Sequence, residues 1–229
     1  MSRRNALICI WSGPVGFAIF GIGILPLAHF LPPLLPSADA ASIAQIYNDN
    51  VIGIRLGAIL VTLAAALLAP FFAMLAVETK RIEGEVAPLT ATQLVTAGIV
   101  VVLFLLGALL WTVAAFRPER SPDEIQLLND LGWILLVTPA PPFFVQTAAL
   151  GIAILSDKKS APVLPRWSGY LTLWLCVLGL PASLGIMFKT GPFAWNGILA
   201  FWLPFSLVAV WIVTMSFAMT SSVKKQVAA

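Results

Sequence analysis

Residues 51–77 read VIGIRLGAILVTLAAALLAPFFAMLAV, and Arg55 is the single charged residue in this run. A bilayer core about 30 Å thick is crossed by an α-helix of about 20 apolar residues. The run is therefore long enough to span a membrane as one helix. Because it is continuously apolar rather than alternating, it favours a helix over a strand of a membrane barrel.

Five further runs of the same kind occupy most of the chain. Hydrophobic residues make up 60% of the 229 residues and charged residues only 10%, whereas ordinary globular domains carry about 25% charged residues. We therefore predict an all-α, polytopic transmembrane helical bundle that forms a single domain over residues 1–229. Its six predicted spans are residues 6–31, 51–77, 93–116, 129–155, 167–188 and 195–219.

The positive charges predict how the bundle is oriented. Lys and Arg are enriched in cytoplasmic loops, so the net charge of +3 reports orientation and not affinity for nucleic acid. With both termini cytoplasmic, nine cations lie inside and three outside. The inner set is Arg3, Arg4, Lys80, Arg81, Lys158, Lys159, Arg166, Lys224 and Lys225, and the outer set is Arg117, Arg120 and Lys189. We expect the protein in the cytoplasmic (inner) membrane of a bacterium.

Three prolines, Pro139, Pro141 and Pro142, lie near the middle of the fourth span. Each proline removes a backbone donor and disfavours a helical residue before it. We therefore predict that the fourth span is broken or kinked here. Carbonyls freed at membrane depth must be buried in protein or line a cavity. One interpretation is a binding site, and the other is a structural kink whose carbonyls are satisfied nearby. The candidate ligand-binding residues of this region are Thr138, Pro139, Gln146 and Thr147.

A second polar group is predicted near the outer ends of the spans. Arg55 lies about one turn inside the second span and Asp130 at the start of the fourth, so the two could pair if those helices touch. Tyr47 and Asn50 precede the second span and complete this candidate ligand-binding group. The alternative is that Arg55 reaches the headgroups and that Asp130 favours the positive end of its own helix.

Three local patterns predict structure between and within the spans. Residues 42–47 suit a short helix on the outer surface, and Ser121 with Glu124 forms a capping-box pattern. A similar pattern at residues 90–93 predicts the start of the third span. Gly53 and Gly57 have the GxxxG spacing of closely packed membrane helices. Their partner is either another helix of this chain or a neighbouring copy.

The residues that are missing exclude several classes of protein. The chain has one histidine, which disfavours haem, copper and metalloprotease sites. It also lacks a phosphate-binding glycine loop, a nucleophile elbow and a CxxC motif. We therefore expect no catalytic residues, no metal and no cofactor.

These observations favour a non-catalytic membrane protein that binds or passes a small apolar or amphipathic molecule within the bundle. The first alternative is an accessory or scaffold subunit of a larger membrane complex. The second is an intramembrane enzyme that uses Asp130 and Arg55. The expected partners are the lipid bilayer, a small hydrophobic ligand, and either further copies of this chain or the other subunits of a heteromeric complex.

Overall fold

The computed structural model describes residues 2–138 and 140–228, and in these ranges the chain is helical without β-strands. Six helical segments are long and apolar enough to cross a membrane. The α-helices are α1 (Arg3–Ile22), α2 (Ala40–Asp49), α3 (Val51–Glu83), α4 (Pro88–Phe116), α5 (Pro122–Val137), α6 (Ala140–Ser156), α7 (Arg166–Gly179) and α8 (Leu203–Ala228).

Three short helical segments of other types extend or precede these helices. A π-helical turn, Gly23–Leu27, continues α1, and a 3₁₀ segment, Leu180–Met187, continues α7. A second π-helical turn, Ile198–Trp202, leads into α8. The first two segments contain Pro26 and Pro181, and Pro204 follows the third. Proline cannot donate the hydrogen bond of a regular helix, which accounts for the changed pattern at these places.

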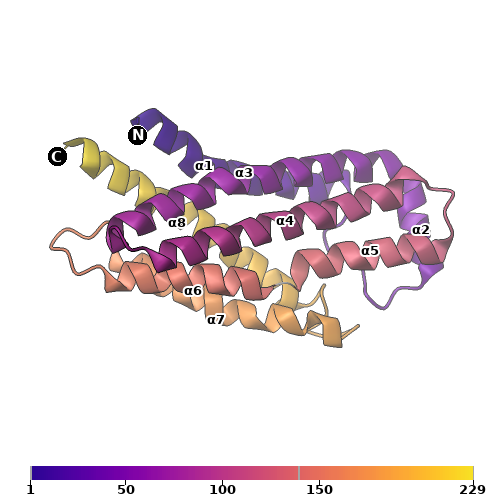
Figure 1. The fold of residues 1–229 in the computed structure, drawn as a ribbon. Coiled ribbons are helices and arrows are strands. Elements are labelled where there is room, and N and C mark those ends of the chain that lie inside the picture. The colour runs from indigo at the N-terminus through magenta and orange to yellow at the C-terminus, as the bar shows by residue number, and fades with distance from the viewer. Residues whose placement is uncertain (1, 139, 229) are drawn as a thin grey trace.

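The long helices form a closed ring. Helix α1 packs against α3, α3 against α4, α4 against α5 and α6, α6 against α7, α7 against α8, and α8 against α1. Both termini lie at one end of this bundle, together with the α3–α4 and α6–α7 connections (Figure 1). We call this the terminal end. Helix α2 and the α4–α5 connection lie at the opposite end, the α2 end.

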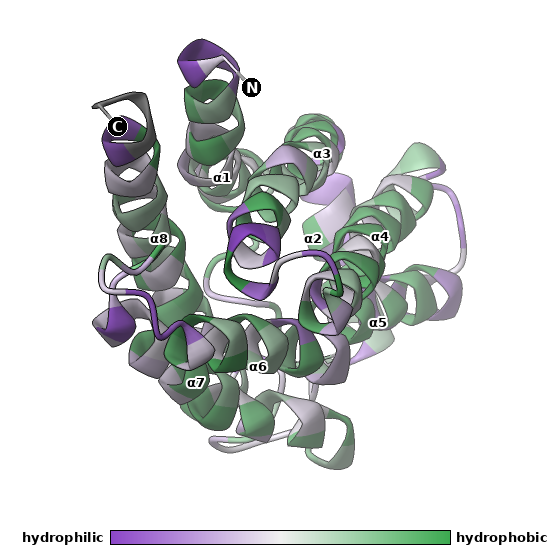
Figure 2. Ribbon diagram, turned by 60° about the vertical axis from the view of Figure 1, so that its left-hand side comes forward, coloured by the Kyte–Doolittle hydropathy of each residue, from purple (hydrophilic) through white to green (hydrophobic). Residues whose placement is uncertain are grey.

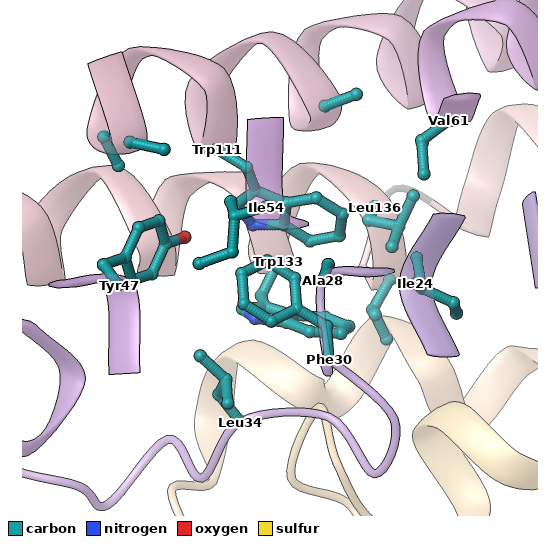
Figure 3. Packing of buried hydrophobic residues seen from close by; sticks show 14 of the residues in the cluster. Ile24, Ala28, Phe30, Leu34, Tyr47, Ile54, Val61, Trp111, Trp133 and Leu136 are labelled. Carbon is teal, nitrogen blue, oxygen red and sulfur yellow. The ribbon is translucent and has the colours of Figure 1, made fainter. Parts of the chain in front are cut away.

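Buried side chains form two clusters along the bundle. One cluster, toward the α2 end, contains the aromatic side chains of Phe30, Tyr47, Trp111 and Trp133 (Figure 3). The other is nearer the terminal end and contains Phe71, Leu75, Leu150 and Trp211. In contrast, many large apolar side chains on the outside of the ring are exposed, for example Ile59 at 60% and Trp174 at 62%. An apolar exterior of this kind suits a bundle surrounded by lipid rather than by water.

The local predictions at helix ends were partly confirmed. The short helix expected at residues 42–47 forms as α2, and its cap is Asp39, whose Oδ1 accepts from Ser42 N at 2.8 Å. That hydrogen bond lowers the pKa of the Asp39 carboxyl. The capping box of Ser121 and Glu124 is also present.

The predicted start of the third span was wrong. Helix α4 begins at Pro88, before residues 90–93. Its first turn is capped by Glu83 of α3, whose carboxylate accepts from Leu89 N at 2.9 Å and from Thr90 N at 2.7 Å. A carboxylate from the preceding helix therefore satisfies donors that the local pattern assigned to a side chain of the helix itself.

The fourth predicted span, residues 129–155, covers the second half of α5 and nearly all of α6. Helix α5 ends at Val137 and α6 begins at Ala140, with Pro141 and Pro142 in its first turn. Pro139 lies outside the described residues. The break or kink that we expected at these prolines therefore stays a prediction, although the junction between the two helices falls at the expected place.

Candidate functional site

A cavity of about 100 Å³ lies inside the ring. Its walls come from all six spans and consist of apolar side chains. Representative lining residues are Phe17 of α1, Phe72 of α3, Phe104 of α4, Leu136 of α5, Phe143 of α6, Leu175 of α7 and Phe205 of α8. The cavity thus lies where the spans converge, and its chemistry is that of a hydrocarbon interior.

Small residues explain why space remains at this position. Ala140, Gly179, Ala182 and Ala200 line the cavity where larger side chains would fill it. Ala182 belongs to the 3₁₀ segment after α7, and Ala200 to the π-helical turn before α8. Changes in helix type shift the direction of the following side chains. Large aromatic rings close the rest of the wall, including Phe205, whose ring lies 6.4 Å from that of Phe104.

The junction between α5 and α6 forms part of this wall. Leu135, Leu136, Val137 and Ala140 all line the cavity, whereas Thr138 does not. A cavity beside the prolines was one of the two interpretations of this region, and a structural kink was the other. The threonines of the region are satisfied by their own helices. Thr138 Oγ1 donates to Ile134 O at 2.6 Å, and Thr147 Oγ1 donates to Phe143 O at 2.8 Å.

Gln146 is different from these threonines. Its side chain is completely buried, and neither amide atom has a hydrogen-bond partner among the described residues. It does not line the cavity, although Phe143 and Phe144 of the same helix do. An unpaired amide in an apolar interior is energetically costly, so Gln146 is expected to destabilise the bundle next to the cavity.

The ion pair between Arg55 and Asp130, which was one of the two interpretations of these residues, does not form. Arg55 instead caps the end of α4, because Nε donates to Ala115 O at 3.0 Å and Nη2 donates to Phe116 O at 3.0 Å. These carbonyls belong to the last turn of α4 and lack partners within it. Helix α3 packs along α4, so Arg55 reaches the end of this neighbouring helix rather than Asp130.

The remaining members of the outer group make hydrogen bonds that do not involve Arg55. Tyr47 donates to Asn129 Oδ1 at 3.3 Å, and Asn129 donates in turn to Asp130 Oδ1 at 3.1 Å. Asn50 Nδ2 donates to Leu27 O at 2.8 Å. Burial raises the pKa of the Tyr47 phenol well above its ordinary value, which keeps the hydroxyl protonated and able to donate. These contacts hold α2 to α5 and to the end of the first span.

The two candidate groups therefore do not form one site. Asn129 precedes Leu136 by seven residues of α5, which corresponds to about 10 Å along a helix. The aromatic rings of Trp111 and Trp133, 4.9 Å apart, belong to the buried cluster in this half of the bundle (Figure 3). The outer group is a set of contacts between helices, and the cavity is a separate apolar feature.

Sequence reasoning missed one polar cluster at the terminal end. Glu78 is fully buried and binds Arg81 Nη1 at 2.6 Å, while Ser222 Oγ of α8 donates to the same carboxylate at 2.9 Å. The three-residue spacing of Glu78 and Arg81 suits a pair on one helix, but no local pattern indicates a contact with Ser222. Within residues 2–138 and 140–228, no group of three His, Cys, Asp or Glu side chains is placed to hold a metal ion.

Comparison with known proteins adds no family to this description. No protein-family model matches the chain, and neither the curated proteins nor the solved structures contain a significant match.

Proposed function

We propose that this multi-pass membrane protein binds a small apolar molecule, or the end of a longer apolar chain, in the cavity at the centre of the ring. The observation that carries the proposal is that apolar side chains of all six spans surround one space of about 100 Å³. An engineered apolar cavity of about 150 Å³ stays dry and binds benzene or xenon. A space of this order therefore suits an apolar guest of a few heavy atoms.

The wall chemistry supports an apolar guest rather than a polar one. Among the residues that line the cavity, Trp211 has a polar side-chain atom, its indole Nε1. This N–H already donates to Thr172 Oγ1 at 2.9 Å. A polar ligand would lose its hydrogen bonds to water without replacement here. An amphipathic ligand would keep its polar part outside the cavity. We further propose that the protein lies in the cytoplasmic membrane of a bacterium with both termini inside, which rests on the distribution of Lys and Arg.

Ala182→Leu tests the cavity directly, because the added carbons would occupy the space. Benzene should raise the melting temperature of the detergent-solubilised wild type, since a ligand of the native state stabilises it. The increase should be absent in Ala182→Leu. The matched control is Ala66→Leu, because Ala66 is an exposed residue of α3, and this variant should retain the increase.

Two results would contradict the proposal. One is an equal benzene effect in Ala182→Leu and wild type, which would place binding elsewhere. The other is the absence of any benzene effect in wild type. If mild-detergent purification also brought down a second protein in stoichiometric amount, the accessory-subunit alternative would replace the ligand-binding proposal.

A further inference from the structure

The terminal end of the bundle brings together four cations on two neighbouring helices. Arg3 and Arg4 begin α1, and Lys224 and Lys225 lie near the end of α8, all with exposed side chains. The first turn of α1 and the last turns of α8 lie at the same end of the bundle (Figure 1), and both of these helix ends contain hydrophilic residues (Figure 2). Neither helix contains an aspartate or glutamate.

Contacts between α1 and α8 set the register of these cations. The rings of Trp11 and Phe217 meet edge to face with centroids 5.4 Å apart. Nearby, Ser216 Oγ donates to Ile10 O at 3.3 Å. Seven residues are about two helical turns, which return nearly to the same face. Arg4 precedes Trp11 by seven residues and Lys224 follows Phe217 by seven, so both cations lie about 10 Å beyond the ring contact toward the terminal end.

The surface between the cations and the rings is hollowed and apolar. A shallow hollow is lined by Arg3, Arg4, Leu7, Ile8 and Trp11. Ile8 is 60% exposed and Trp11 is 37% exposed. The hollow therefore has an apolar floor that continues along the outside of α1 and a cationic rim at the end of the span. This arrangement matches a lipid, whose chains lie along a helix and whose phosphate lies at its end.

None of the four cations at this rim is paired with an acidic side chain of the described residues. Within the described part of the chain, the side chains of Arg3, Arg4, Lys224 and Lys225 have no ion pair or hydrogen bond. The buried carboxylate of Glu78, on the adjacent α3, is held by Arg81 and Ser222. In contrast, Lys80 and Lys159 at the same end donate to backbone carbonyls of Glu85 and Arg81.

From this juxtaposition we propose that the surface formed by the hollow on α1 and the cationic end of α8 binds an anionic phospholipid that carries two phosphate groups. One phosphate lies against Arg3 and Arg4, where guanidinium groups present paired donors to phosphate oxygens. The other lies against Lys224 and Lys225. The acyl chains lie on Ile8 and Trp11. Basic pockets between membrane helices are known to take such headgroups. The site is independent of the central cavity and of which side of the membrane the termini occupy.

The test compares lipids that differ in phosphate number. Delipidated full-length protein in detergent is titrated with cardiolipin, phosphatidylglycerol or phosphatidylcholine, and bound lipid is counted by native mass spectrometry. Cardiolipin should bind at one site with higher affinity than the others. Arg4→Gln/Lys224→Gln should weaken cardiolipin binding at least tenfold, since each cation near a membrane surface contributes roughly fivefold. Arg117→Gln/Lys189→Gln removes the same charge at the α2 end and should leave this affinity unchanged.

Other variants separate a lipid site from general charge attraction. Trp11→Ala should weaken cardiolipin binding because it removes the apolar floor, while inorganic pyrophosphate should not bind measurably to the wild type. Equal losses in the two double variants would overturn the proposal in favour of nonspecific attraction. Equal affinity for phosphatidylglycerol and cardiolipin would contradict the requirement for two phosphates. Tight binding of pyrophosphate would contradict the proposal that the ligand is a lipid.

Discussion

At the scale of single residues, the structure distinguishes buried polar side chains that link helices from others, Gln146 among them, that lack a hydrogen-bond partner among the described residues. Arg55 and Asn50 each donate to carbonyls of a neighbouring helical segment. Gln93 donates to Phe72 O and accepts from Thr79 Oγ1, both at 3.4 Å. Gln146 is equally buried but has neither kind of contact among the described residues. The sequence does not distinguish these polar residues from one another. In the structure, hydrogen-bonded residues stabilise the fold, whereas an unpaired buried amide destabilises it.

Gln146→Met should therefore stabilise the protein. Methionine has nearly the shape of glutamine and lacks the unpaired amide, so we expect a gain of about 1–3 kcal/mol in the free energy of unfolding. Denaturation in mixed detergent micelles measures it. Gln93→Met is the matched control, because it breaks existing hydrogen bonds and should destabilise. A loss of stability in Gln146→Met would show that the amide has a partner in the membrane.

Arg55→Gln should destabilise the protein by about 1.5–3 kcal/mol, the range for hydrogen bonds to a charged group. The reason is that the last carbonyls of α4 lose their donor. Asp130→Asn removes the charge that the sequence offered as a partner. In a double-mutant cycle of unfolding free energies, the coupling between the two positions should be close to zero. A coupling free energy above about 1 kcal/mol would show that Arg55 and Asp130 interact, and it would contradict the structure.

At the scale of helices, small residues set which spans approach closely. Gly57 of α3 lies against the first span, where an added Cβ would come within 3.0 Å of Ala28 Cβ and would clash with Gly23 O. Gly107 and Gly132 allow a similar approach of α4 and α5. The GxxxG pattern of Gly53 and Gly57 therefore serves contacts within this chain. The interpretation as a contact between copies is not needed to explain it.

Gly57→Ala should cost about 1–3 kcal/mol of stability, because the backbone of the first span would have to move. Gly98→Ala is the control, since an added Cβ at this position of α4 meets nothing within 4 Å. Alanine favours a helix over glycine by about 1 kcal/mol, so this control should be neutral or stabilising. Equal effects of the two substitutions on thermal unfolding in detergent would contradict the packing explanation.

At the scale of the whole molecule, a closed ring of six spans holds two aromatic-rich clusters with an apolar cavity lined by every span. The hydrophilic residues collect at the ends of the long helices (Figure 2). An even number of spans brings the N- and C-termini to the same end, as observed. Which side of the membrane that end faces rests on the distribution of cations and stays a prediction.

Single cysteines test this orientation in a variant that lacks Cys9 and Cys176. Glu119→Cys lies in the α4–α5 connection and Ser160→Cys in the α6–α7 connection, at opposite ends of the bundle. In intact cells, a membrane-impermeant maleimide should label the first and not the second. Labelling of Ser160→Cys alone would invert the orientation, and labelling of both would contradict the six-span topology.

Much of the fold followed from local properties of the sequence. The length of an apolar run reports whether it can cross a bilayer, so the six spans were predictable. Pairs three residues apart meet on one helix, so the contact between Glu78 and Arg81 and the capping box at Ser121 were predictable as well. The prolines at residues 139, 141 and 142 marked the region where α5 ends and α6 begins, although they did not indicate what faces it.

The candidate site depended on the tertiary structure. A helix that is apolar on all sides carries no signal of which face meets which neighbour. For this reason the sequence did not show whether Arg55 pairs with Asp130 or reaches the headgroups. In the structure α3 packs beside α4, and Arg55 donates to the carbonyls of Ala115 and Phe116 instead. The cavity likewise exists because Ala140, Gly179, Ala182 and Ala200 converge from four separate segments. The lengths and apolar composition of the runs determined that this chain forms membrane spans. Contacts between spans that are distant in the sequence decided where side chains pack tightly and where the cavity remains.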